Sequence, residues 1–278
     1  MDVPIITSRS GLSIPAIGLG TYSLDGNNGT DSITTAIRIG YRLLDSAVNY
    51  ENEGAVGGAV RRSEVPRHEL IVTSKLPGRH HRFDEALTTV EESVMRMGLD
   101  VIDIYLIHWP NPRENLYVEA WSALIEARDQ GLVHHIGVSN FLPEHLERLR
   151  NETGELPALN QIELHPFFPQ ADALAYHREN GIITESWSPL GRGSDLLTNP
   201  IITSIADQHG ISPAQTVLAW HVHLGAIPIP KSTLIERQRE NLNVFDVSLT
   251  SDNIELIDTL ARFDGRLANQ DPAVYQEF

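Results

Sequence analysis

The chain has 278 residues, 41% of them hydrophobic, and a formal net charge of -16. This acidic balance argues against nucleic acid as a partner, and the lack of cysteine excludes disulfides, thiolate metal sites and a cysteine nucleophile. The start MDVPIITSRSG has no apolar signal core, and no apolar run approaches the length of a membrane span. We therefore expect no membrane partner and a cytoplasmic location.

The predicted elements alternate between short β-rich runs and longer segments of helical spacing, the pattern of βα units around a parallel sheet. Residues 5–15 indicate a β-hairpin with a Ser-Gly turn, and Ser212 followed by Pro213 and Gln215 predicts a capped helix over 213–224. Eight strands are expected, over residues 17–20, 41–46, 70–75, 102–109, 136–140, 158–164, 182–187 and 226–230. The sequence predicts a single-domain α/β protein over residues 1–278, a (β/α)₈ TIM barrel with the N-terminal hairpin closing one end.

A doubly wound nucleotide-binding fold is the alternative architecture. That fold normally shows a G-x-G-x-x-G turn after its first strand. The stretches GLGTYS (18–23) and GRGSDL (191–196) begin in this way but end in Ser and Leu, and no Walker-type phosphate loop is present. The barrel is therefore favoured.

Polar or aromatic residues stand at the carboxyl ends of seven of the expected strands. Barrel enzymes place their chemistry at this end. One buried polar residue can be explained by a satisfied hydrogen bond, but seven in one layer indicate a site. These residues are Asp45, Lys75, His108, Ser139 with Asn140, Gln161 or Glu163, Trp187 and Lys231.

Lys75 is one of only two lysines in a chain with 21 basic side chains. Lysine offers a compact charge and a movable pKa, whereas arginine stays protonated and needs a planar site. A tyrosine with an ordinary pKa of about 10 is a sluggish acid near neutrality. We expect Lys75, held charged by Asp45, to lower the pKa of Tyr50 so that Tyr50 protonates a carbonyl oxygen oriented by His108.

Six stretches together resemble the aldo-keto reductase family, and within it the bacterial diketogluconate reductases. The resemblance follows nearly the whole chain in order, and ESWSPLG at 185–191 is part of it. The six are GYRLLDSAVNYENEGAVGGAV (40–60), VTSKLPG (72–78), GLDVIDIYLIHWP (98–110), IGVSNF (136–141), LNQIELHP (159–166) and IPKSTLIERQREN (229–241).

The resemblance implies a barrel that uses a nicotinamide cofactor without a Rossmann fold, with the catalytic tetrad on Asp45, Tyr50, Lys75 and His108. It also implies that one group of residues holds the nicotinamide, a second the pyrophosphate and a third the adenosine end. The nicotinamide group is Ser139, Asn140, Gln161 and Trp187. The pyrophosphate group is Ser188, Leu190 and Arg192. The adenosine group is Lys231, Ser232, Arg237 and Asn241, and Gly20 and Thr21 are also assigned to the cofactor.

Three phosphate-binding donors, Lys231, Ser232 and Arg237, lie within one strand-to-helix turn, which indicates the 2′-phosphate of NADPH. Leu234 stands where some relatives have Arg, and from the resemblance we expect this departure to loosen the preference for NADPH.

The substrate pocket is expected to be shallow and open, because the tail after Phe263 is short and polar. Asn49 stands where relatives commonly have an apolar residue. The expected walls are Tyr22, Asn49, Trp109 and Phe141.

No metal site is expected from the twelve histidines. Neighbouring histidines such as His80 and His81 point to different faces, and His221 and His223 on the predicted helix do not converge.

The predicted function is NADPH-dependent reduction of an aldehyde or ketone, either a small carbonyl, an α-dicarbonyl or a keto-sugar acid. Two alternatives stay open. One is a Schiff-base aldolase with Lys75 as the amine nucleophile, and the other is a regulatory barrel that binds NADPH with little turnover. The family resemblance makes a monomer the expected state.

Overall fold

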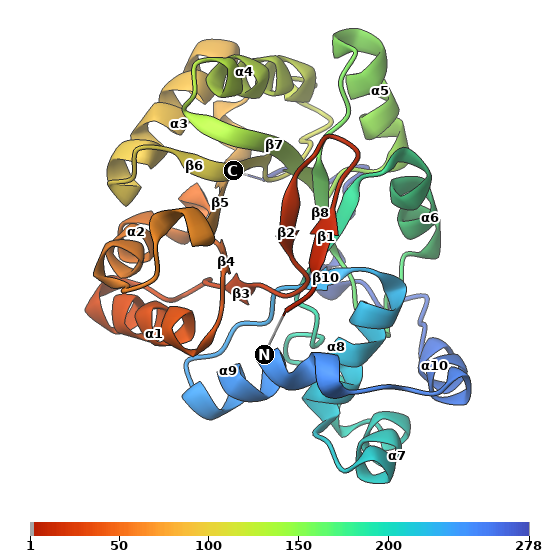
Figure 1. Cartoon of the computed structure of the whole chain (residues 1–278). Helices are drawn as coiled ribbons and strands as arrows, with labels where there is room; N and C mark the ends of the chain where they lie inside the picture. The colour runs from red at the N-terminus through yellow and green to blue at the C-terminus, as the bar shows by residue number, and fades with distance from the viewer. Residues whose placement is uncertain (1–2, 278) are drawn as a thin grey trace.

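The computed structural model describes residues 3–277, and a parallel eight-stranded sheet forms the centre of this region (Figure 1). The sheet runs in chain order, and each strand is hydrogen-bonded to the next in parallel register. The strands are β3 (Leu19–Gly20), β4 (Leu43–Asp45), β5 (Ile71–Leu76), β6 (Ile102–Ile107), β7 (Val133–Ser139), β8 (Leu159–Glu163), β9 (Ile183–Trp187) and β10 (Ile227–Pro228). All eight predicted strands are confirmed.

Helices surround the strands on the outside of the barrel (Figure 1). They are α1 (Gly26–Ile39), α2 (Glu53–Arg62), α3 (Phe83–Met97), α4 (Tyr117–Asp129), α5 (Pro143–Thr153), α6 (Ala171–Asn180), α7 (Pro200–His209), α8 (Pro213–Leu224), α9 (Ile235–Leu242) and α10 (Ser251–Asp258). The predicted helix over 213–224 is α8, with the Ser212 hydroxyl accepting from the Gln215 N–H. Among the helices of residues 3–277, none is long and apolar enough to cross a bilayer.

The N-terminal hairpin closes one end of the barrel, as predicted. Its strands β1 (Ile5–Thr7) and β2 (Ser13–Pro15) pair antiparallel, and the ribbon lies across the barrel mouth (Figure 1). The hairpin side chains Leu12 and Ile14 are buried in a cluster with strand residues that include Ile104 and Leu159. Full burial of an aliphatic side chain stabilises the fold by about 1.5–3 kcal/mol.

The barrel closes where β3 meets the β10 segment, and glycine residues make this close approach of the two strands possible. The Gly18 and Gly20 N–H groups donate to the carbonyls of Pro228 and Pro230 at 3.1 and 3.3 Å. A Cβ at Gly20 would lie 2.7 Å from the Ile229 carbonyl oxygen, closer than real Cβ atoms come. This approach requires a residue without a side chain.

Candidate active site

A cavity of about 650 Å³ opens at the carboxyl ends of the strands. This is where a parallel barrel brings together residues far apart in the sequence. Its walls include fourteen of the predicted site residues: Gly20, Tyr22, Asp45, Asn49, Tyr50, His108, Trp109, Asn140, Gln161, Trp187, Ser188, Leu190, Arg192 and Lys231.

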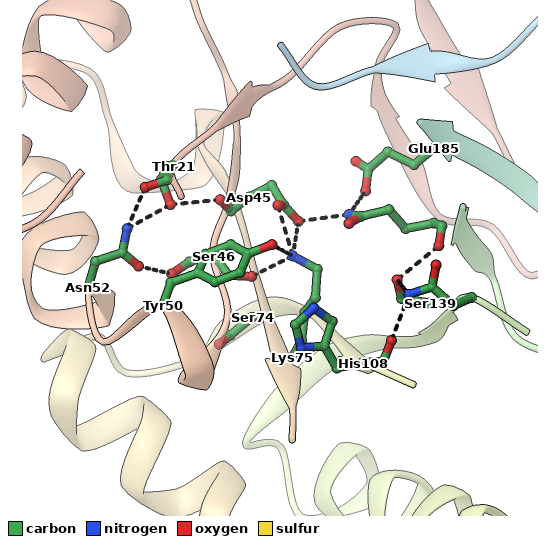
Figure 2. Close-up of polar contacts among 12 residues, drawn as sticks. Thr21, Asp45, Ser46, Tyr50, Asn52, Ser74, Lys75, His108, Ser139 and Glu185 are labelled. Carbon is green, nitrogen blue, oxygen red and sulfur yellow. Dashed lines mark hydrogen bonds and ion pairs between the residues drawn. The ribbon is translucent and has the colours of Figure 1, made fainter. Parts of the chain in front are cut away.

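Lys75 lies at the centre of a buried polar cluster beside this cavity (Figure 2). Its Nζ is 2.7 and 2.8 Å from the two carboxylate oxygens of Asp45. It also donates to the Ser46 carbonyl at 2.8 Å and approaches the Tyr50 hydroxyl at 3.5 Å. The side chain has no exposed surface, so the ammonium is held by fixed oxygen partners in place of water.

The pKa values of this cluster follow from burial and charge. Burial lowers the pKa of Lys75, but Asp45, Tyr50 and Glu185 outweigh it and leave that pKa above its ordinary value. For Tyr50, burial raises the pKa, and Lys75 opposes the rise without cancelling it. The expectation that Lys75 brings the pKa of Tyr50 below its ordinary value is therefore wrong, because burial is the larger effect. The phenol is protonated at neutral pH.

The loop that presents Tyr50 is fixed by amide and hydroxyl contacts. Asn52 donates to the Thr21 carbonyl at 2.6 Å and accepts from Ser46 at 2.7 Å. The Thr21 hydroxyl donates to the Asp45 carbonyl at 2.7 Å and does not line the cavity. Thr21 therefore supports the Asp45 and Tyr50 segments, as Figure 2 shows.

A second buried carboxyl group, Glu185, lies behind Gln161. The Gln161 amide nitrogen donates to Asp45 Oδ1 at 2.8 Å and also to Glu185. Burial, with a contribution from Asp45, raises the pKa of Glu185 to about 8. Because both N–H bonds of Gln161 point at carboxyl groups, its amide oxygen is the atom left for a ligand.

His108 completes the tetrad and has an unexpected partner. Its ring lies edge-on to Tyr50, with centroids 5.9 Å apart. Its Nδ1 lies 2.7 Å from a carboxylate oxygen of Glu277, which comes from the far end of the chain. The structure thus brings the four predicted tetrad residues together and adds a carboxylate on the outer side of His108.

The residues predicted to hold a nicotinamide surround one wall. Trp187 Nε1 donates to Asn140 Oδ1 at 2.7 Å, which fixes the indole plane. The Asn140 amide donates to the His108 carbonyl and the Ser139 hydroxyl, both at 3.0 Å. Ser139 is buried and donates to the Gln161 carbonyl, so it supports Asn140 and does not line the cavity.

The residues predicted to hold the adenosine end follow β10. Lys231 is exposed and lines the cavity, and Arg237 is exposed on α9. Ser232 is largely buried, and its hydroxyl bonds the Leu234 backbone. Asn241 is also buried. Lys231 and Arg237 are therefore exposed at this end, while Ser232 holds the turn and Asn241 is packed inside.

The prediction that Phe141 forms a wall of the pocket is wrong. Tyr22, Asn49 and Trp109 line the cavity, but Phe141 is 1% exposed and packs edge-on against Tyr117 and His145. Asn140, at φ 63°, has a left-handed backbone just after β7, and the Phe141 side chain that follows is packed in the main hydrophobic core.

The expectation of an open pocket also needs correction. Gln270, Tyr275 and Glu277 of the tail line the cavity, and the Tyr275 ring lies 4.5 Å from that of Trp109. The tail thus forms part of the wall.

Sequence reasoning missed Glu185 and the tail residues. Glu185 could have been predicted as a site residue, because side chains two apart on a strand share a face and Trp187 was already assigned to the site. No pattern in the sequence indicates Glu277, since its partners Asn49, Gly78 and His108 are more than 160 residues away along the chain.

The model of the Aldo/keto reductase family matches residues 16–262. The chain belongs to this family. Among curated aldo/keto reductases and relatives, the chain is 52% identical to 2,5-diketo-D-gluconic acid reductase B of Corynebacterium sp. (strain SHS752001), covering 99% of both chains. It is 44% identical to an aldo-keto reductase of Mycolicibacterium smegmatis, covering 98% of both. The resemblance found in the sequence motifs is confirmed.

Solved aldo/keto reductase structures show the same fold. A crystal structure of a Gox0644 mutant in complex with NADPH superposes with a TM-score of 0.94 at 39% identity, covering 99% of this chain and 100% of that one. The predicted (β/α)₈ barrel is confirmed.

Proposed function

We propose that this chain is an NADPH-dependent reductase that transfers a hydride to the carbonyl carbon of an aldehyde or ketone, with Tyr50 as the proton donor. The observation that supports this most is Lys75 held between the Asp45 carboxylate and the Tyr50 hydroxyl, beside a cavity that Tyr50 and His108 line. Membership of the aldo/keto reductase family agrees with it.

The tetrad performs the proton half of this reaction. Tyr50 is protonated at neutral pH, so its hydroxyl is in the donor form. When the carbonyl oxygen takes that proton, the phenolate left on Tyr50 lies 3.5 Å from the Lys75 ammonium, which stabilises it. Asp45 keeps the ammonium charged. His108, on the edge of the Tyr50 ring, donates a hydrogen bond that orients the carbonyl oxygen.

The residues around the cavity fit a nicotinamide cofactor, which supplies the hydride when bound. The Gln161 amide oxygen is free to accept from the carboxamide, and the Trp187 indole, fixed by Asn140, presents a flat face. Arg192 belongs to the 188–193 turn assigned to the pyrophosphate, and its guanidinium carbon lies 4.9 Å from the centroid of the Tyr22 ring. Lys231 and Arg237 supply the charges assigned to the 2′-phosphate of NADPH.

The aldolase alternative is disfavoured by the same geometry. An amine nucleophile must be neutral and reach the substrate. Lys75 has no exposed side-chain surface, does not line the cavity and has a pKa above its ordinary value. Borohydride trapping of a substrate adduct on Lys75 would restore this alternative.

NADPH oxidation with a panel of carbonyl compounds tests the proposal. The panel contains small polar aldehydes, α-dicarbonyls and keto-sugar acids, ranked by kcat/KM. We expect at least one to sustain many turnovers per protein. A single turnover with retained product would instead favour the regulatory barrel that binds NADPH with little turnover.

We further propose a single-domain monomer that acts on small carbonyl compounds in the cytoplasm. The acidic net charge of -16 and the lack of cysteine support this setting. Light scattering of the purified protein and fractionation of the source cells measure the two properties.

A further inference from the structure

The segment 275–277 brings a carboxylate into the wall of the cavity, directly behind His108. Glu277 Oε1 lies 2.7 Å from His108 Nδ1 and accepts from the Asn49 amide at 2.8 Å. Its Oε2 accepts from the Gly78 N–H at 2.8 Å. The backbone of Glu277 is held as well, because the Asn111 side chain donates to its carbonyl at 2.8 Å and accepts from its N–H at 2.9 Å.

These partners keep the carboxylate ionised. Burial raises the pKa of Glu277, but His108, Gly78 and Asn49 outweigh it and hold that pKa below its ordinary value. The side chain is 9% exposed, so water screens its charge only partly. A fixed negative charge therefore lies one imidazole ring away from the place where His108 and Tyr50 meet a carbonyl oxygen.

The nearby cations do not neutralise this wall. Lys75 is paired with Asp45, and Arg79 is exposed and bonds Asn49 on the outer side. Arg192 stacks on Tyr22, and Lys231 lies on the side assigned to the cofactor. Replacing Glu277 by glutamine removes the negative charge from this side of His108 while keeping a side chain of the same shape.

We propose that Glu277 is a specificity-determining residue that makes the pocket select neutral carbonyl compounds over those bearing a carboxylate next to the reacting carbon. This inference rests on the proposed reductase function. Glu277 lines the same cavity as His108 and Tyr50, so a carboxylate on the carbon next to the reacting carbonyl enters a space with a negative wall, and the two like charges repel. An ester at the same place carries no charge and meets no such barrier.

The test compares benzoylformate with its neutral methyl ester, whose phenyl ring suits the aromatic walls Trp109 and Tyr275. The measured quantity is the ratio of kcat/KM for the acid to kcat/KM for the ester, which cancels changes common to both substrates. Glu277→Gln should raise this ratio at least about tenfold, as expected for removing one charge at close range in a poorly solvated pocket. An unchanged ratio overturns the proposal.

Two further variants separate charge from shape. Glu277→Asp keeps the charge and should keep the wild-type ratio, so a rise equal to that of Glu277→Gln would contradict the proposal. Glu51→Gln removes a charge from an exposed side chain near Tyr50 that does not line the cavity. Because water and salt screen that charge, the acid-to-ester ratio of Glu51→Gln should differ from the wild-type ratio by less than about twofold.

The wild-type protein gives an independent answer if Glu277→Gln does not fold. Product inhibition by mandelate should be at least about tenfold weaker than that by methyl mandelate, and equal inhibition overturns the proposal. Failure of the proposed function looks different, because then no carbonyl compound supports NADPH oxidation by the wild-type protein.

Discussion

At the scale of single residues, the position of Lys75 explains why this arginine-rich chain has lysine there. Four oxygen atoms, from Asp45, Ser46 and Tyr50, surround Nζ within 3.5 Å, and no part of the side chain reaches water. A point-like ammonium fits this arrangement, whereas a planar guanidinium would displace at least one partner. Charge alone therefore does not define the position.

Lys75→Arg should reduce carbonyl reduction at least about a hundredfold, although it preserves the charge, because misplacement of Tyr50 removes general acid catalysis. The expected signature is a fall in kcat with the dissociation constant of NADPH near wild type. Thermal unfolding of the same preparation checks that the variant is folded. Turnover close to wild type would show that the position needs only a positive charge.

Glu185 gives a prediction about pH and stability. Its pKa is about 8 in the folded chain against an ordinary 4.5, so between these values the unfolded chain releases a proton that the folded chain keeps. The free energy of unfolding therefore falls as pH rises through this window, by at most about 5 kcal/mol. Glu185→Gln should lose this component, and its Tm should decline less than that of wild type between about pH 5 and pH 8.

The matched control is Glu114→Gln, which alters an exposed carboxylate. Its Tm should follow the wild-type pH dependence. A parallel pH dependence for wild type and Glu185→Gln would show that Glu185 is already ionised in the folded protein.

At the scale of elements, the segment from β10 into α9 is the candidate reader of the cofactor's 2′-phosphate. Ser232 and Gln238 fix this turn, since the Ser232 hydroxyl bonds the Leu234 backbone and Gln238 donates to the Ser232 carbonyl at 2.8 Å. Lys231 and Arg237 remain exposed on it. Scaffold and charge are thus supplied by different residues of one segment.

Arg237→Ala should weaken NADPH at least about tenfold and leave NADH nearly unchanged, because a charge-assisted hydrogen bond contributes roughly 1.5–3 kcal/mol. Titration of both cofactors by fluorescence measures this. Equal weakening of the two would assign Arg237 to support of the segment.

At the scale of the whole molecule, the sequence was informative wherever the fold is periodic. The eight strands and α8 follow from alternating and helical patterns, and parallel strands necessarily bring Asp45, Lys75, His108 and Gln161 to one end. Such positions depend only on strand order and direction. Three members of the tetrad could therefore be placed together before the structure, whereas Tyr50, which lies after β4 in a 3-10 turn, was assigned from its chemistry and the family resemblance.

The remaining features depend on non-periodic geometry. Phe141 follows a left-handed Asn140, and nothing in the sequence states to which side such a turn sends the next side chain. Glu277 reaches His108 through the irregular segment after the 3-10 turn Leu267–Asn269, held by contacts with Asn111 and Gly78. The pKa of Tyr50 is set by the balance of burial and Lys75, which only the folded cluster determines.

The central claim is that this barrel transfers a hydride from NADPH to a carbonyl carbon while Tyr50 gives the proton. The most direct measurement is turnover of NADPH that carries deuterium at both C4 positions with a reducible aldehyde, comparing wild type with Tyr50→Phe, which lacks only the hydroxyl. Wild type should place deuterium on the carbinol carbon of the product over many turnovers. Tyr50→Phe should bind NADPH as wild type does but turn over about 10²–10⁴-fold more slowly. Product without deuterium, or a Tyr50→Phe variant that retains more than about a tenth of wild-type turnover with chemistry limiting the rate, would contradict the account.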